Sequence, residues 1–313
     1  MGYHLRIESD VLSSFITTRT CGSRLWFINN KRLEDSILGY TAKYANRYNV
    51  TLYAFAIVGN HTHGLAEFPE MNRASYMRDL NSSIARVVER YVKNYPGGRL
   101  WARRYSQEFP PEPADIEDYF FYTVLQPVQD GQAERISDYD GYNCFHDAVY
   151  GIKRTFKVVR WKEYHDAKRH NPHVTVSDYT ETVTLQYERL PGYEELSQAE
   201  YAKVMHQKLE ERRVRIVRER RARGQGFVSA EVRAKQKPGA TPRSTKTSDR
   251  NTHRPRILSR NDETRAYFKD WYFAIQFAYQ EASERYRKGD SSVQFPAGTY
   301  PPWRPPTEPA LIH

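Results

Sequence analysis

The sequence predicts an α+β domain in its first half. Two segments rich in β-branched and aromatic residues, at about 15–27 and 52–68, have the character of strands. Each is followed by a segment whose apolar residues recur at helical spacing, at about 33–48 and 73–94. With 313 residues and 39% hydrophobic content, we expect one compact domain with extensions.

The predicted helices are bounded by ordinary stop and start signals. The segment after residue 72 has a buried stripe and ends at a proline followed by two glycines, Pro96 to Gly98. A later helix is expected to begin at Asp115, a good N-cap residue, and to continue until Pro127 ends it. The aromatic residues along the helix at 73–94 are interpreted as core.

Two histidines follow a polar turn in the most apolar part of the chain. The stretch 52–68 reads as a strand, a turn at Gly59 and Asn60, and a second strand that begins with His61 and His63. Alternate residues of a strand share a face, so both imidazoles can bind one metal ion. Two surface histidines are the simpler interpretation. A hydrolase with an H-x-H-x-D pattern is excluded, because Leu65 stands where Asp is needed.

Tyr122 and Gln126 provide a second pair of polar side chains. They are four residues apart on the predicted helix and therefore share one face. A tyrosine in an aromatic helix is commonly a core residue. Together with the histidine pair, another assignment is available, in which Tyr122 is a nucleophile and Gln126 is a third metal ligand.

The positive charge of the chain is local. Residues 208–260 contain 17 Lys/Arg and 5 Asp/Glu, a net charge of +12, whereas the whole chain carries +10, so the remainder sums to −2. This favours a polyanion partner, and nucleic acid over membrane because no apolar helix face accompanies the arginines. The alternative is that these arginines form salt bridges that hold the extension to the core.

Three stretches, taken in order, resemble the single-tyrosine HUH transposases, and in particular the REP-associated tyrosine transposases. They are VGNHTHGL, the long helix leading into LWARRY, and YTVLQPVQDGQAERISDYDGY. The similarity covers about residues 10–150. It implies a ferredoxin-like sandwich with a central antiparallel sheet, the histidines on a central strand and the tyrosine helix packed across it.

The resemblance also implies roles for individual residues. His61, His63 and Gln126 would be metal ligands, and Tyr122 the nucleophile. Thr62 departs from the bulky apolar residue usual between the histidines, and Gln126 replaces the more frequent Asn. Interleaved cations and flat rings suit unpaired bases and phosphates, although exposed arginines can simply be solvated. The residues expected to contact DNA are Arg19, Asn60, Trp101, Arg103 and Arg104.

The predicted chemistry is a phosphoryl transfer on DNA. A phenol with a pKa of about 10 is a poor nucleophile at neutral pH, so Mg²⁺ or Mn²⁺ is expected to assist it. Attack would give a 5′-phosphotyrosine and a free 3′-hydroxyl, with no nucleotide cofactor. Single-stranded or hairpin DNA is the expected partner. A catalytically silent single-strand binder and a different metal-dependent hydrolase are the alternatives.

We expect four regions: the transposase domain at 1–150, a polar segment with a basic helix at 151–233, a disordered basic linker at 234–261, and a helix with a proline-rich tail at 262–313. Residues 151–196 carry no clear pattern. Ser197 and Glu200 form a capping box for a helix toward Arg223. Without a long apolar run or a disulfide framework, the chain is expected to be cytoplasmic and not membrane-bound. The mass added after residue 150 favours a monomer, with a dimer as the alternative.

Overall fold

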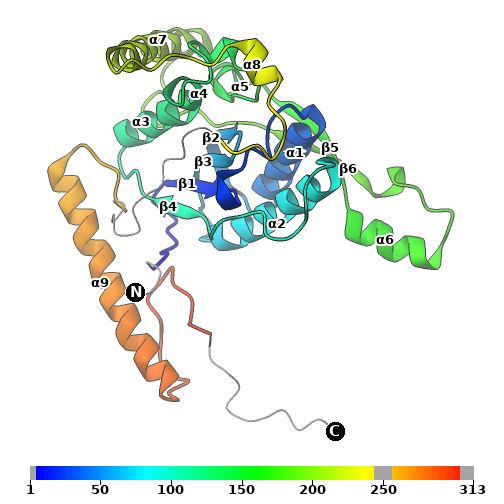
Figure 1. Cartoon of the computed structure of the whole chain (residues 1–313). Coiled ribbons are helices and arrows are strands. Elements are labelled where there is room, and N and C mark those ends of the chain that lie inside the picture. The colour runs from blue at the N-terminus through cyan, green and yellow to red at the C-terminus, as the bar shows by residue number, and fades with distance from the viewer. Residues whose placement is uncertain (1–4, 243–255, 304–313) are drawn as a thin grey trace.

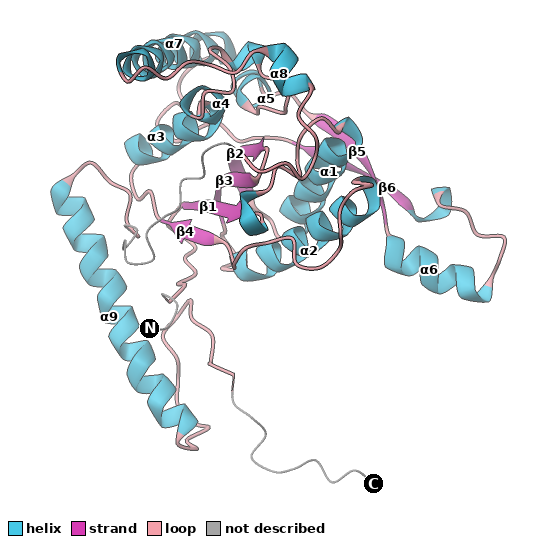
Figure 2. Ribbon diagram, viewed as in Figure 1, coloured by secondary structure: helices cyan, strands magenta, loops and turns pink. Residues whose placement is uncertain are grey.

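A computed structural model describes residues 5–242 and 256–303, and its centre is a four-stranded antiparallel sheet (Figures 1 and 2). The sheet order is β2-β3-β1-β4. The strands are β1 (Ser14–Arg19), β2 (Thr51–Val58), β3 (His61–Glu67) and β4 (Ser106–Glu108). With helices after β1 and β3, the chain order βαββαβ is the ferredoxin-like arrangement.

The histidine strand β3 lies inside the sheet, between β1 and β2. His63 is paired with Thr17 on one side and Ala56 on the other, and His61 with Arg19 and Val58. The prediction of a central antiparallel strand is therefore confirmed. Because β3 has neighbours on both sides, its backbone groups are bonded within the sheet and its side chains are held firmly in direction.

Helices cover both faces of the sheet (Figure 1). On one face α1 (Lys31–Arg47) packs against α2 (Arg73–Tyr91), and on the other α3 (Pro113–Val124) crosses β2 and β3. The largest hydrophobic core lies between these layers, with Ile37, Ile84 and Phe120 fully buried. The tyrosine helix thus packs across the histidine strand, as predicted.

The start and end of α3 both differ from the sequence prediction. Glu112 is the N-cap, and Asp115 is the third helical residue of a reciprocal capping box rather than the cap itself. The helix ends at Val124, and a separate turn, α4 (Gln126–Gln129), follows. The break has a simple cause, since Pro127 has no N–H to donate to the preceding turn.

The segment after residue 143 contains two short helices and a two-stranded sheet that packs on the outside of α1. It comprises α5 (Phe145–Tyr150), β5 (Arg154–Val159), α6 (Trp161–His170), a 3-10 turn at Ser177–Tyr179 and β6 (Thr180–Leu185). Two further 3-10 turns lie earlier in the chain, at Cys21–Ser23 and Ile136–Asp138. The antiparallel pair of β5 and β6 packs on α1 at Gly39, where a Cβ would approach Val158 to 2.9 Å. The α6 helix extends away from the body (Figure 1).

The C-terminal extension is helical and built onto the domain. Its elements are α7 (Gln198–Ala222), opened by the predicted Ser197–Glu200 capping box, α8 (Ala230–Ala234) and α9 (Asp262–Arg287). Ile257 is buried and forms a parallel bridge with Phe109 just beyond β4. The expected linker at 234–261 thus has packed ends, and residues 243–255 and the tail beyond 303 lie outside the described residues. None of the described helices is long and apolar enough to cross a membrane.

Candidate active site

The two histidines lie side by side at the start of β3. Their ring centroids are 4.6 Å apart and the ring planes are nearly perpendicular, at 87°. His61 is 3% exposed and His63 is 4% exposed. Two imidazoles at this separation within a sheet can present nitrogen atoms to one ion, which is what the H-x-H spacing predicts.

Asn60 fixes the orientation of the His61 ring. Its Oδ1 lies 2.6 Å from His61 Nδ1, while its Nδ2 donates to the carbonyl of Ser23 at 2.9 Å. Because the second bond identifies which amide atom is nitrogen, the oxygen must face the histidine, and Nδ1–H donates to it. In the neutral ring, Nε2 then carries the lone pair that a metal ion requires.

His63 is held in a comparable way from the neighbouring strand β1. Thr17 Oγ1 is 2.9 Å from His63 Nδ1, and the Phe15 ring stacks on the imidazole at 5.2 Å with an interplanar angle of 16°. Thr17 is directly opposite His63 in the sheet register. Both histidines are therefore oriented through Nδ1, by partners that belong to the sheet or its turn.

The Tyr122 ring lies against this pair. It is 5.7 Å from the His63 ring at 80° and 5.6 Å from Phe15 at 87°, and the residue is 39% exposed. Tyr119, one turn earlier on α3, contacts the same Phe15 ring. It is half-buried, less exposed than Tyr122, and burial raises its pKa to about 12. Of the two tyrosines, Tyr122 is the more accessible.

Gln126 is the first residue of α4, after the break that ends the helix of Tyr122. Its side chain is 3% exposed and its Nε2 donates to Gln129 Oε1 at 3.4 Å. Gln129 in turn donates to the carbonyl of Tyr122 at 3.5 Å. Tyr122 and Gln126 therefore belong to two helices, whereas the sequence predicted one helix with both residues on one face. Gln129 is hydrogen-bonded to both of them. Across residues 5–242 and 256–303, no three His, Cys, Asp or Glu side chains are grouped as metal ligands.

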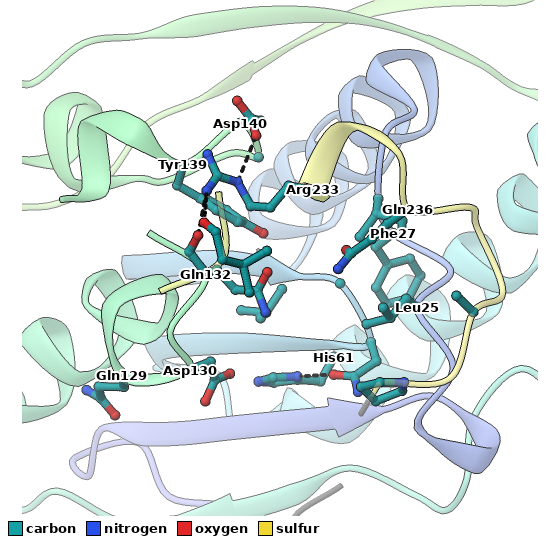
Figure 3. Close-up of a pocket in the computed structure, with 18 of the residues that line it drawn as sticks. Leu25, Phe27, His61, Gln129, Asp130, Gln132, Tyr139, Asp140, Arg233 and Gln236 are labelled. Atoms are coloured by element: carbon teal, nitrogen blue, oxygen red, sulfur yellow. Dashed lines mark hydrogen bonds and ion pairs between the residues drawn. The ribbon is translucent and has the colours of Figure 1, made fainter. Parts of the chain in front are cut away.

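Two cavities open beside these residues. One, of about 1200 Å³, is lined by His61, Arg19 and Asn60, and Figure 3 shows the Asp130 carboxylate beside the His61 ring. The other, of about 470 Å³, is lined by Tyr122 and by arginines of the extension that include Arg215. Gln129 borders both cavities. His61 thus lines one cavity and Tyr122 the other, with Gln129 between them.

A model of one protein family matches the part of the chain that contains this histidine pair. The family is described as transposase IS200 like, and the match covers residues 18–109. This segment is similar to the IS200-like transposases. The match ends before α3, so it includes both histidines but neither Tyr122 nor Gln126.

Solved structures also resemble the chain. One is a REP-associated tyrosine transposase bound to a REP hairpin, at 18% identity and a TM-score of 0.37, covering 47% of this chain and 84% of that one. Another, from Deinococcus radiodurans R1 and described as a candidate transposase, has 17% identity and a TM-score of 0.28, and covers 39% of this chain and 96% of that one. No curated protein matches the chain.

The five residues that were predicted to contact DNA differ in exposure and in their surroundings. Arg19 lines the His61 cavity, and Arg103 and Arg104 are exposed. Asn60 is buried and its amide is used to orient His61. Trp101 is half-buried, packs 5.8 Å from Phe27 and donates its indole N–H to Asn81 at 2.9 Å. Asn60 and Trp101 thus also make structural contacts, and DNA contact stays a prediction for all five residues.

Sequence reasoning missed several residues that surround the candidate site. Thr17 and the orienting role of Asn60 depend on the pairing of β1 with β3. Asn60 could have been suggested by its place directly before His61. Arg215 and the packing of α7 beside Tyr122 have no local signal, because the two segments are far apart in the sequence.

Proposed function

We propose that this protein is a metal-dependent single-strand DNA transposase that cleaves and rejoins DNA through a tyrosine–DNA intermediate. The observation that carries the proposal is the contact of three rings, His61 with His63 at 4.6 Å and His63 with Tyr122 at 5.7 Å. The family of the domain supports DNA strand transfer in general. The motifs described above favour hairpin-flanking single strands as the substrate.

The donor set fits a divalent cation. Two buried imidazoles each have a hydrogen-bond partner at Nδ1. With Nδ1–H as the donor in each ring, Nε2 is the atom that can bind the ion, and the Gln126 amide can add an oxygen. His61, His63 and Gln126 would hold Mg²⁺ or Mn²⁺. When bound, the cation supplies positive charge that neutralises the phosphate oxygens and steadies the negative charge of the transition state.

In the proposed reaction, Tyr122 Oη attacks the scissile phosphorus. The Oη–P bond forms as the bond from phosphorus to the 3′ oxygen breaks, the phenol proton passes to solvent, and the 3′ oxygen takes up a proton. Tyr122 is suited to this role because it is exposed at a cavity and rests on the His63 ring. The 5′-phosphotyrosine keeps the phosphodiester energy for rejoining.

A denaturing gel tests the proposal directly. The full chain is mixed with a hairpin-flanked single strand labelled at either end, in Mn²⁺ or in chelator. A 3′-end label should move with the protein, whereas a 5′-end label should appear on a shortened strand with a free 3′-hydroxyl. Binding without any covalent species would instead indicate a silent binding protein, and cleavage without an adduct would indicate a hydrolase.

A further inference from the structure

The cavity beside His61 is walled by a part of the chain outside the transposase domain. Its volume is about 1200 Å³, larger than the roughly 300–1000 Å³ that small-molecule pockets occupy. One side is formed by His61 and the loop at Leu25 and Phe27, and the other by residues 225–242, called here the wall segment (Figure 3). A ligand that fills this cavity would therefore contact both His61 and the extension.

Arg233 fastens the wall segment to the domain. Its guanidinium donates to Asp140 Oδ2 at 2.9 Å and to the carbonyls of Gln132 at 2.6 Å and Asp138 at 2.5 Å. The side chain is only 9% exposed. A buried guanidinium with this many acceptors holds the segment in one place, so the cavity is a formed feature of the fold.

A second attachment joins the wall segment to the loop before α1. Leu25 N–H donates to Ala240 and Gly239 N–H donates to Leu25, each at 2.9 Å. Asn29 Nδ2 donates to the carbonyl of Gln236 at 2.8 Å. Gly239 has a φ of +87°, and a Cβ there would lie 2.5 Å from the Trp26 ring, so the close approach requires glycine.

The lining has the chemistry of a site for unpaired nucleotides. Apolar side chains, among them Leu25 and Phe27, offer surfaces for flat rings, and Arg19 supplies a cation near His61. Gln132 and Gln236 extend their amides into the cavity (Figure 3), and within the described residues neither amide makes a side-chain hydrogen bond. A glutamine amide can donate to and accept from one base edge at the same time.

We propose that this cavity binds unpaired nucleotides adjacent to the scissile phosphate and that Gln132 and Gln236 read the edge of a base there. The inference rests on the proposed function, because it places the same DNA strand at His61 and in the cavity. It gives the extension a part in sequence selection. A cavity of this volume has room for more than one nucleotide.

The test uses the full chain and the rate of covalent adduct formation. In hairpin-flanked single strands, each nucleotide near the cleavage site is replaced in turn by an abasic residue or another base. For the wild type, at least one position should slow the reaction roughly ten- to a hundredfold, as expected for lost base-edge hydrogen bonds. The double variant Gln132→Ala/Gln236→Ala should make that position nearly indifferent.

Gln207→Ala is the matched control, because it truncates an exposed amide of α7 that bonds Glu211 away from the cavity. It should keep the wild-type profile. An unchanged profile in the double variant would overturn the inference while the proposed function stands. A wild type that forms no adduct with any strand would instead overturn the proposed function.

A measurement on the unaltered protein guards against a variant that misfolds. A photoreactive 5-iodouracil placed at the sensitive position should crosslink to cavity residues such as Phe27 or Tyr139. Crosslinks confined to the surface of α6 or α9 would contradict the assignment.

Discussion

The Tyr122 ring meets the His63 ring edge to face, with centroids 5.7 Å apart and planes at 80°. The contact joins a helix to a central strand. Phe15 and Thr17 of the neighbouring strand β1 hold the His63 ring in place. The tyrosine therefore contacts a residue whose orientation the sheet already fixes. The predictions that follow concern this junction and the extension that surrounds it.

The orienting residues should matter for activity more than for folding. Asn60→Ala and Thr17→Val remove the partners of His61 Nδ1 and His63 Nδ1. We expect metal-dependent cleavage to fall about 10- to 100-fold, the usual cost of losing a hydrogen bond behind a metal ligand. Thr51→Val, at the far end of β2, is the control. Equal cleavage rates for Thr17→Val and Thr51→Val, measured with comparable circular dichroism, would contradict the orienting role.

Loss of a histidine ligand should reduce metal-dependent cleavage more than loss of the glutamine ligand. His61→Ala or His63→Ala should abolish cleavage at ordinary metal concentrations, because an imidazole is the stronger ligand. Gln126→Ala should weaken cleavage and be partly restored by excess Mn²⁺. Cleavage is measured against metal concentration for each variant. Full activity of His61→Ala in chelator would exclude this site as the metal centre.

The strands, the helices and the histidine pair could be predicted because their signals are local. Alternation and helical spacing are properties of short windows, and His61 and His63 need only the geometry of their own strand. The contact of Tyr122 with His63 follows from the packing of α3 across the strand that carries the histidines, which was also predicted. The break at Leu125 was missed because the proline was expected to end one helix, whereas it opens another turn.

The cavity wall could not be predicted, because its contacts join distant segments. Asn29 meets Gln236 and Arg233 meets Asp140 across long stretches of chain. A polar residue in the sequence does not reveal its partner, so the arginines of residues 208–260 could be assigned either to DNA or to salt bridges. Several described ones form salt bridges, including Arg212 with Asp118 at 2.8 Å and Arg221 with Glu134 at 3.0 Å.

Fewer cations should therefore contribute to DNA affinity than the composition suggests. Among the described residues of 208–242, Arg215, Arg218, Lys235 and Lys237 are exposed and make no salt bridge. Changing all four to Gln should flatten the log–log salt slope of single-strand binding by roughly three, at about 0.7 for each cation. Cleavage at saturating DNA should persist.

Lys162→Gln/Lys203→Gln, two exposed cations outside both cavities, provides the comparison for this experiment. Fluorescence anisotropy at several salt concentrations gives the slopes. If the quadruple variant and the wild type share one slope, these side chains do not neutralise phosphates.

The ion pairs that hold α7 to α3, made by Lys208 and Arg212 with Glu117, should be sensitive to acid. Burial acts to raise the pKa of Glu117, but hydrogen bonds from Lys208 and Tyr193 and the nearby Arg212 outweigh it and hold the pKa below its ordinary value of 4.5. A carboxyl whose pKa is lower in the folded state stabilises it above the unfolded pKa. That stability is lost as pH falls through the folded pKa.

Glu117→Gln should therefore destabilise the protein by about 1–3 kcal/mol at neutral pH and by less in acid. Urea unfolding at both pH values measures the difference. Glu211→Gln, an exposed change on α7, should have little effect at either pH. A loss for Glu117→Gln that is the same in acid and at neutral pH would show that charge is not the cause.

The central claim is that Tyr122 becomes joined to DNA. Tyr122→Phe removes only the hydroxyl, so folding and DNA binding should be retained while the adduct disappears from a denaturing gel. Tyr119→Phe is the matched control on the same helix, since burial raises the pKa of Tyr119 to about 12. The account predicts an adduct with the wild type and Tyr119→Phe and none with Tyr122→Phe. An adduct that survives in Tyr122→Phe would contradict it.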